Sequence, residues 1–269
     1  MFLTPLERPD PEELEQLLKT DPPAAVERLR LHAERGEPQL QLLLGQLLIN
    51  GVGTSRDASE SLRWFRAAAR ARVPMAMNMI GRCYEHGLGT AADYIQAARW
   101  YHRAAIYDCD WAIYNYAHML ANGRGVEKDR SAAFRWFKLA AVRGHARAMA
   151  FLGQYYENGW EAPLDLATAV CLYKRSAEAG DYRGQCSYAS VLADQGRIEE
   201  ALSWLRLAVN TAPPHYLAQL APALRRSPFE ALRAFAETVH LTRPATPGPG
   251  TYASRGVPQT SVQSRSKLW

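Results

Sequence analysis

The sequence predicts an all-helical solenoid, a right-handed stack of about five two-helix hairpins with helices at both ends. Three observations predict it. A small residue returns about every 36 residues, a Gly-bearing turn follows each copy, and an aromatic pair before two small residues ends each copy. A hairpin this short cannot bury its own apolar face, so it must stack on its neighbours.

The first helix of each hairpin is defined by the column of small residues, which lets two helices approach closely. That column contains Gly45, Gly81, Ala117, Gly153 and Ala189. An apolar or aromatic residue lies one position before the small residue, and further core residues lie four positions on either side of that residue, as in Leu40, Leu44 and Leu48. Steps of three and four place them on one face of a helix, which we expect to be the core face.

The turn and the second helix have their own signals. A glycine after the first helix suits a left-handed closing position, as at Gly51, Gly87, Gly123 and Gly159. An aspartate then stands where the second helix should begin, and its side chain can cap the free amides. These aspartates are Asp57, Asp93, Asp129 and Asp165. Aromatic pairs such as Trp100-Tyr101 precede small pairs such as Ala104-Ala105, so large and small side chains can interlock.

This order of residues, clearest in Met75–Asp108 and Ala112–Gly144, resembles the Sel1-like repeat, a relative of the tetratricopeptide repeat. The resemblance covers about Leu40–Val209. It implies an adaptor between proteins that has no catalytic activity, with the first helices lining the concave face. The chain departs from the pattern at Leu172, at Glu161 in place of the second turn glycine, and in the shorter last turn, Asp194–Arg197.

The ends of the chain extend the repeats with other helices. We expect capping helices in residues 1–36, repeats in 37–212, further capping helices in 213–242 and a disordered basic tail in 243–269. Asp10-Pro11 and Ser227-Pro228 suit the first positions of helices, and the helix after Ser227 should end near His240. Pro222 should interrupt or kink the helix predicted for Tyr216–Arg226.

Composition excludes several classes of function. The net charge is +5 and the pI about 9.1, but four of these charges lie after Thr242, so the body is near +1 and we do not expect nucleic acid to bind. No apolar run could span a bilayer and no signal peptide is evident, which predicts a cytoplasmic protein without a membrane partner. The four cysteines form no Cys-x2-Cys pair, so free thiols are expected.

A search for catalytic chemistry finds nothing with the required spacing. Cys83 and His86 form an isolated Cys-x-x-His, too few ligands for zinc. Ser264 and Lys267 match Ser-x-x-Lys, but without partner motifs and within the expected tail. The sequence therefore predicts a non-catalytic protein that needs no metal or cofactor.

The expected binding site lies on the part of the first helices that core packing does not fix. There the residue types vary and include an aromatic and polar patch typical of interfaces. Its members are Asn78, Arg82, Trp111, Tyr114, Asn115, His118, Arg147, Phe151 and Gln154. We expect a monomer that binds a peptide or helix of a partner protein there. Packing of Trp111 and Phe151 between repeats is the alternative for those two side chains.

The sequence is also compatible with two other functions. Helical repeats can read RNA bases with variable residues of their first helices, although the near-neutral body argues against it here. The chain could also be a regulatory subunit of an enzyme complex.

Overall fold

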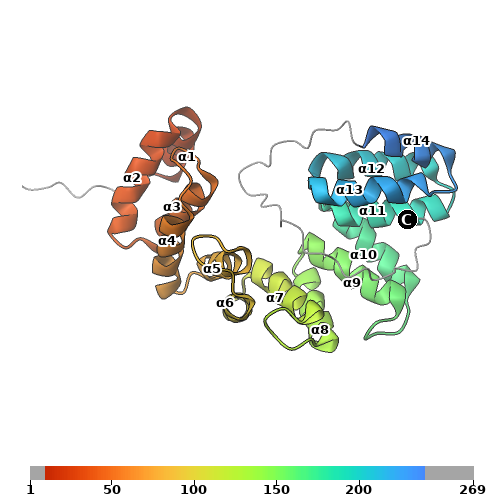
Figure 1. Ribbon diagram of the computed structural model, residues 1–269, viewed down its shortest axis with the longest axis horizontal. Coiled ribbons are helices and arrows are strands. Elements are labelled where there is room, and N and C mark those ends of the chain that lie inside the picture. The colour runs from red at the N-terminus through yellow and green to blue at the C-terminus, as the bar shows by residue number, and fades with distance from the viewer. Residues whose placement is uncertain (1–9, 240–269) are drawn as a thin grey trace, which may run out of the picture. The chain divides into compact units, whose positions relative to one another are not determined.

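The computed structural model describes residues 10–239 and contains, within them, fourteen α-helices and no strand (Figure 1). The chain divides into two compact units, Met1–Ala133 and Phe134–Trp269. The predicted all-helical fold is confirmed. Within residues 10–239, no helix is long and apolar enough to cross a bilayer.

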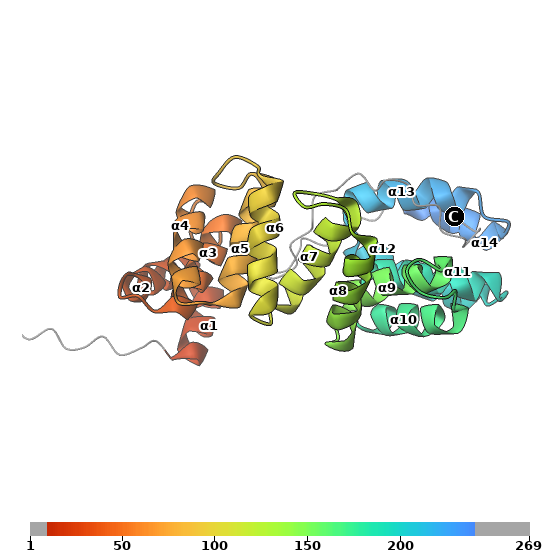
Figure 2. The same cartoon turned by 90° about the horizontal axis from the view of Figure 1, so that it is seen from below.

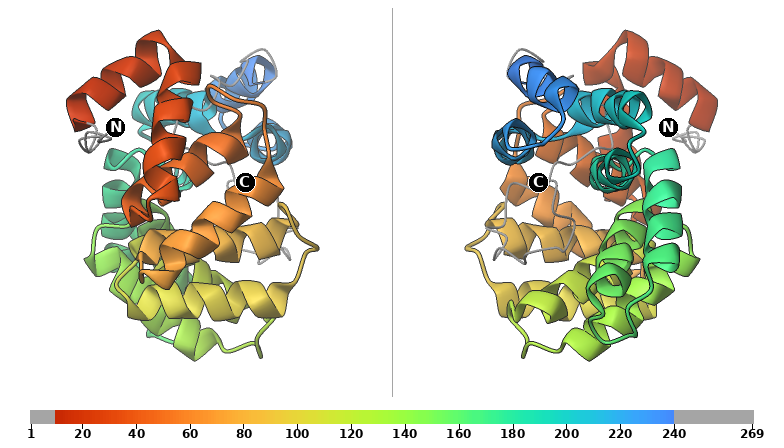
Figure 3. Two further views of the ribbon diagram at one scale, coloured as in Figure 1. Left: turned by 90° about the vertical axis from the view of Figure 1, so that its left-hand side faces the viewer. Right: turned by 90° about the vertical axis from the view of Figure 1, so that its right-hand side faces the viewer.

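The first unit is a series of helices in which each packs on the next in sequence (Figure 3). Its helices are α1 Pro11–Thr20, α2 Pro22–Glu34, α3 Pro38–Asn50, α4 Ala58–Arg70, α5 Pro74–His86, α6 Tyr94–Ile106 and α7 Asp110–Asn122. Helix α8, Arg130–Val142, contains the boundary between the units. The hairpins are α3–α4 and α5–α6, preceded by the pair α1–α2, and α7 packs on both α5 and α6.

The recurring small residue brings the two helices of a hairpin together, as predicted. A Cβ added to Gly81 would lie 2.7 Å from the ring of Tyr101, and one added to Gly45 would lie 2.6 Å from the ring of Phe65. Both rings are completely or almost completely buried. The second aromatic of each pair therefore fills the space that the glycine leaves, and the first, such as Trp64, remains half-buried.

The turns also follow the prediction. Gly87 closes α5 in the left-handed conformation (φ 65°), and its N–H donates to the carbonyl of Cys83. Asp93 then caps α6 by accepting a hydrogen bond from the Gln96 N–H at 3.0 Å. The other three predicted aspartate caps, Asp57, Asp129 and Asp165, accept the equivalent bond at 2.8–3.0 Å.

The second glycine of each turn in the first unit touches the preceding hairpin or pair. A Cβ on Gly53, Gly89 or Gly125 would overlap the backbone of Pro22, Ala58 or Tyr94, respectively. Each turn thus rests on the first residue of an earlier helix. This contact requires glycine because there is no room for a side chain.

The second unit repeats the hairpin and ends in two further helices. It contains α9 Ala146–Asn158, α10 Leu166–Glu178, α11 Tyr182–Asp194, α12 Ile198–Thr211, α13 Pro214–Arg225 and α14 Glu230–Thr238. One hydrophobic core joins α10–α12 to Leu217, Leu224 and Leu232 of the terminal helices. The two terminal helices, α13 and α14, pack on each other (Figure 3). Glu161, where the first unit has glycine, adopts the same left-handed backbone (φ 56°).

The C-terminal helices differ from the prediction in two details. Pro222 lies inside α13 without dividing it, since α13 runs from Pro214 to Arg225. The prediction that Ser227 caps the last helix is wrong: α14 begins at Glu230 after Phe229, which makes no side-chain cap. The buried Ser227 hydroxyl accepts the Phe229 N–H at 3.3 Å, and Arg233 donates to the carbonyls of Ser227 and Pro228. These bonds hold the segment as a turn. The predicted tail, 243–269, lies outside the described residues.

Candidate functional site

The predicted binding residues fall on three helices in two units. Asn78, Arg82, Trp111, Tyr114, Asn115 and His118 lie on α5 and α7 of the first unit. We call these six residues the α5–α7 surface. Arg147, Phe151 and Gln154 form a separate group on α9 of the second unit.

An amide pair joins the two helices of the α5–α7 surface. Asn115 on α7 donates from Nδ2 to Oδ1 of Asn78 on α5 at 2.9 Å. Asn78 is 3% exposed and also contacts the sulfur of Met75 at 3.7 Å, whereas Asn115 is half-buried. The pair fixes the register of adjacent hairpins, and the amide of Asn115 is the member nearer to solvent.

The aromatic residues of α7 differ in exposure. Trp111 at the start of the helix is 41% exposed, whereas Tyr114 is 7% exposed. The Tyr114 ring lies 6.3 Å from the half-buried ring of His118. Asn122, one turn further on, donates from Nδ2 to the His118 carbonyl at 2.8 Å. Of these three rings, Trp111 is therefore exposed, His118 half-buried and Tyr114 buried.

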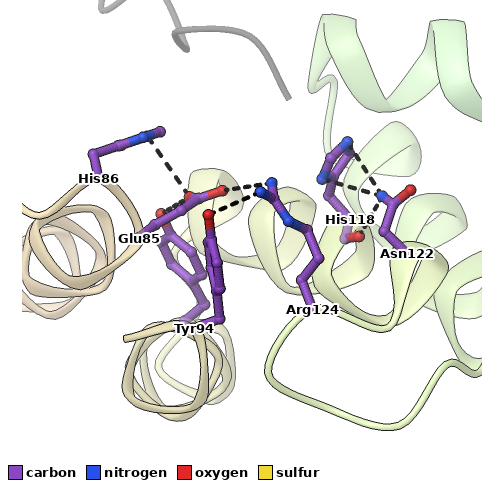
Figure 4. A network of polar contacts seen from close by, with 7 residues as sticks. Glu85, His86, Tyr94, His118, Asn122 and Arg124 are labelled. Carbon is purple, nitrogen blue, oxygen red and sulfur yellow. Dashed lines mark hydrogen bonds and ion pairs between the residues drawn. The ribbon is translucent and has the colours of Figure 1, made fainter. Parts of the chain in front are cut away.

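A polar network lies at the end of α5 and was not predicted from the sequence (Figure 4). The Tyr101 hydroxyl donates to Glu85 at 2.7 Å, and Arg124 Nη1 lies 3.8 Å from the same carboxylate. Arg124 also donates to the Tyr94 hydroxyl at 3.0 Å, with its guanidinium 4.5 Å from the centre of that ring. The network ties the turn after α7 to both helices of the preceding hairpin.

Burial governs the titration of Cys83 and His86, the pair considered for a metal. Burial raises the pKa of the Cys83 thiol to about 12, with only partial opposition from the positive charges of Arg82 and Arg66. Burial also lowers the pKa of His86, and the charges of Arg82 and Arg124 lower it further against the opposing effect of Glu85. In the part of the chain that the structure describes, no group of three or more His, Cys, Asp or Glu side chains could hold a metal ion.

The α9 residues in the second unit take part in packing. Phe151 stacks on Phe137 with ring centres 5.3 Å apart and planes within 4°. Arg147 Nε lies 3.7 Å from Asp181, the buried cap of α11. Burial raises the pKa of Asp181 against the charges of Arg183 and Arg147. The stacking of Phe151 on Phe137 agrees with the alternative in which the Phe151 side chain packs between repeats. Gln154 is half-buried.

The α5–α7 surface offers an exposed indole, an imidazole, an amide and a half-buried guanidinium on two rigid helices. These groups donate and accept hydrogen bonds and present an apolar ring, which is the chemistry of a recognition surface. The sequence could have suggested the Glu85 network from Arg124, a charged residue between two glycines, but not its partners on another hairpin.

Comparison with known proteins agrees with this architecture. The Sel1 repeat profile matches residues 38–72, 74–106, 112–145 and 146–181, more than half of the chain. A Sel1 repeat protein from Oxalobacter formigenes has 25% identity and a TM-score of 0.71, covering 86% of this chain and 98% of its own. No curated protein sequence matched.

Two further solved structures are similar. A protective antigen of uropathogenic Escherichia coli, which displays an SLR fold, has 25% identity and a TM-score of 0.62, covering 81% of this chain and 49% of its own. An immunity protein from Pseudomonas aeruginosa shares the fold at 16% identity, with a TM-score of 0.52, covering 76% and 81% of the two chains.

Proteins built from such repeats are generally protein-interaction modules and are typically non-catalytic. The four matched repeats coincide with the four hairpins from α3 to α10. The chain belongs to the Sel1 repeat family.

Proposed function

We propose that the protein is a non-catalytic scaffold whose α5–α7 surface binds a peptide or helix of a partner protein. The observation that carries this proposal is Trp111, a large apolar side chain left 41% exposed beside the Asn78–Asn115 amide pair. Packing of the hairpins does not require a tryptophan at this position, because the equivalent first helices carry Gln39 and Met75. Tryptophans flanked by polar groups are typical binding hot spots.

Each residue of the surface has a defined part in this proposal. Trp111 supplies the apolar anchor, and Asn115 and His118 supply hydrogen bonds to the partner. Arg82 adds positive charge, which favours a carboxylate of the partner. Asn78 and Tyr114, being buried, hold Asn115 and His118 in position. On α9 of the second unit, Gln154 and Arg147 are proposed as separate partner contacts, with Phe151 as their packing support.

The scaffold acts as a monomer in the cytoplasm in this proposal. The four cysteines support this location, since each is a free thiol and three are buried. A reducing compartment keeps thiols in that state.

Affinity capture with matched variants tests the proposal. The full chain carrying Trp111→Ala and His118→Ala is compared with wild type and with Leu207→Ala, which removes an exposed apolar side chain from α12. Tyr114 is left intact because truncation of a buried ring would disturb the fold. Quantitative mass spectrometry should show a host protein captured by wild type and by Leu207→Ala but lost from the double variant, with unchanged circular dichroism. Equal capture by all three proteins would reject the α5–α7 surface.

A further inference from the structure

One position of the second helices carries a basic residue in every hairpin. Trp64 and its equivalents in the other second helices form a column: Trp64, Trp100, Trp136, Leu172 and Trp204. The residue two positions after each of them is basic and exposed in all five hairpins. These residues are Arg66, His102, Lys138, Lys174 and Arg206. Core packing does not fix an exposed position, so the recurrence of basic residues there is a feature of the surface.

In the first unit, the exposed face of α4 consists of one stripe at steps of three and four residues. It contains Ser59, Arg63, Arg66 and Arg70. The equivalent face of α6 presents Arg99 and His102 between the exposed Ile95 and Ile106, with Arg103 beside them. The Arg103 guanidinium lies 5.5 Å from the centre of the half-buried Trp100 ring. Five arginines and a histidine therefore lie on the exposed faces of two helices.

The carboxylate carried by these two helices is already engaged. Glu60 is the single acidic residue within α4 and α6, and its side chain is 16% exposed. It accepts hydrogen bonds from Arg30 of α2 and from Nε1 of Trp64 at 3.1 Å. Arg63 lies 3.9 Å from Glu60 yet keeps 74% of its side chain exposed. The positive charge on these faces is therefore open to an external anion.

The two faces occur in successive hairpins that are locked together. The turn before α6 rests on the first residue of α4, through Gly89 and Ala58. Arg66 of α4 donates to the Tyr84 hydroxyl of α5 at 3.0 Å. Helices α3 to α6 lie alongside one another in Figure 2. The cations of α4 are thus repeated by those of α6 one hairpin further along the stack.

We propose that the exposed faces of α4 and α6 bind the phosphodiester backbone of a nucleic acid. A polymer that presents the same anion at every step matches arginines that recur at the same position of successive hairpins, as Arg63 and Arg99 do. Arginine suits this role because its planar fork matches phosphate oxygens and can stack on bases. The net charge of the chain up to Thr242 is near +1, and this sum does not show that arginines are concentrated on α4 and α6.

Other anionic partners fit these faces less well. A bilayer surface would favour apolar side chains among the cations on both helices. The α6 face has Ile95 and Ile106, but the α4 stripe has only serine and arginine. An acidic protein segment would not require arginine at the same position of successive hairpins, as at Arg63 and Arg99. The proposed nucleic-acid surface is on the second helices, so it goes beyond the partner site proposed on α5 and α7.

Fluorescence anisotropy of labelled oligonucleotides tests this proposal with the full chain. The probes are a 20-residue oligouridylate, the matching oligothymidylate and a 20-base-pair DNA duplex. Competitors are polyglutamate of equal charge and vesicles containing phosphatidylserine. The test variant is Arg63→Gln with Arg99→Gln, and the control is Lys19→Gln with Lys128→Gln, which removes the same charge from other exposed sites of the first unit.

Wild type should bind a single-stranded probe with an affinity that falls as salt rises, with a log–log slope of roughly −2 to −4 at about 0.7 per phosphate contact. The test variant should bind about tenfold more weakly at 50 mM salt, with a slope smaller by about 1 to 2. The control should stay within about twofold of wild type. Comparison of the three probes identifies which nucleic acid supplies the phosphodiester.

Three results would overturn the proposal. The first is no binding of any oligonucleotide at low salt. The second is an equal loss in the control variant, which would mean that net charge alone is responsible. The third is binding of polyglutamate or vesicles at least as tightly as RNA with the same dependence on Arg63 and Arg99. None of these results bears on capture through Trp111, so the two proposals can fail separately.

Discussion

Gly125 lies directly against Tyr94, and a Cβ at Gly125 would overlap the carbonyl oxygen of Tyr94. The turn that follows α7 therefore rests on the first residue of α6, and Arg124 beside it donates to the Tyr94 hydroxyl at 3.0 Å. A backbone contact and a side-chain contact at the same place hold one hairpin in register with the next.

Gly125→Ala should destabilise the first unit by more than the cost of its left-handed conformation (φ 67°). That conformation alone costs about 1–2 kcal/mol for an alanine, and the overlap with Tyr94 adds to it. The measurement is the free energy of urea unfolding. Gly36→Ala is the control, since its φ is also positive (90°) but no atom lies within 4 Å of an added Cβ. Equal losses in the two variants would contradict the contact.

Arg72→Gly should stabilise the protein. Arg72 has a φ of 60° and occupies the column in which Gly36, Gly144 and Gly180 end the second helix or pair. Glycine removes the left-handed strain but makes the unfolded chain more flexible, so the net gain should be about 0.5–1 kcal/mol. Urea unfolding measures it, and a loss of stability would show that the Arg72 side chain makes a contact worth more than the strain.

Thiol reagents should distinguish Cys171 from the other cysteines in the native protein. Cys171 is exposed, whereas burial raises the pKa of Cys83 and of Cys186 to about 12 and also raises that of Cys109. At pH 8 a thiol with that pKa is on the order of one part in ten thousand thiolate, the reactive form. A chromogenic disulfide should titrate one thiol in the native protein and four in denaturant. Rapid reaction of more than one native thiol would refute this.

His86 should make the stability of the first unit depend on pH. Its pKa is lowered in the folded state, chiefly by burial, so below about pH 6.5 the unfolded chain binds a proton that the folded chain does not. This contribution is complete above that pH and is lost as the pH falls. The urea midpoint should therefore drop more between pH 7.5 and 5.5 in wild type than in His86→Gln. Parallel behaviour of the two proteins would exclude His86 as the cause.

The regular part of the fold could be predicted because each hairpin repeats the same local solution. The glycine opposite Tyr101, the left-handed Gly87 and the cap at Asp93 each follow from one residue type at one position. Repetition made the pattern visible in a single sequence. The segment at Ser227 occurs once, so no second copy was available for comparison. There Arg233 donates to the carbonyls of Ser227 and Pro228, and the segment forms a turn where a helix cap was predicted.

The candidate site could be predicted only in outline. The pattern placed Trp111 and Tyr114 on the variable side of their helix, but burial of Tyr114 depends on three-dimensional neighbours that spacing does not specify. The Glu85–Arg124 ion pair was missed because its residues belong to different hairpins. The cations on α4 and α6 were missed because a net charge summed over the body hides where the charges lie.

The contact between each turn and the helix before it also bears on how such a chain can grow in evolution. In the first unit, the turns at Gly89 and Gly125 rest on the start of the preceding hairpin's second helix, and Gly53 makes the same contact with α2. Duplicating one whole period of the gene would supply both halves of a new junction, wherever the copied stretch began. Copying half a period would leave a turn with no helix beneath it, so lengthening should proceed only in complete steps.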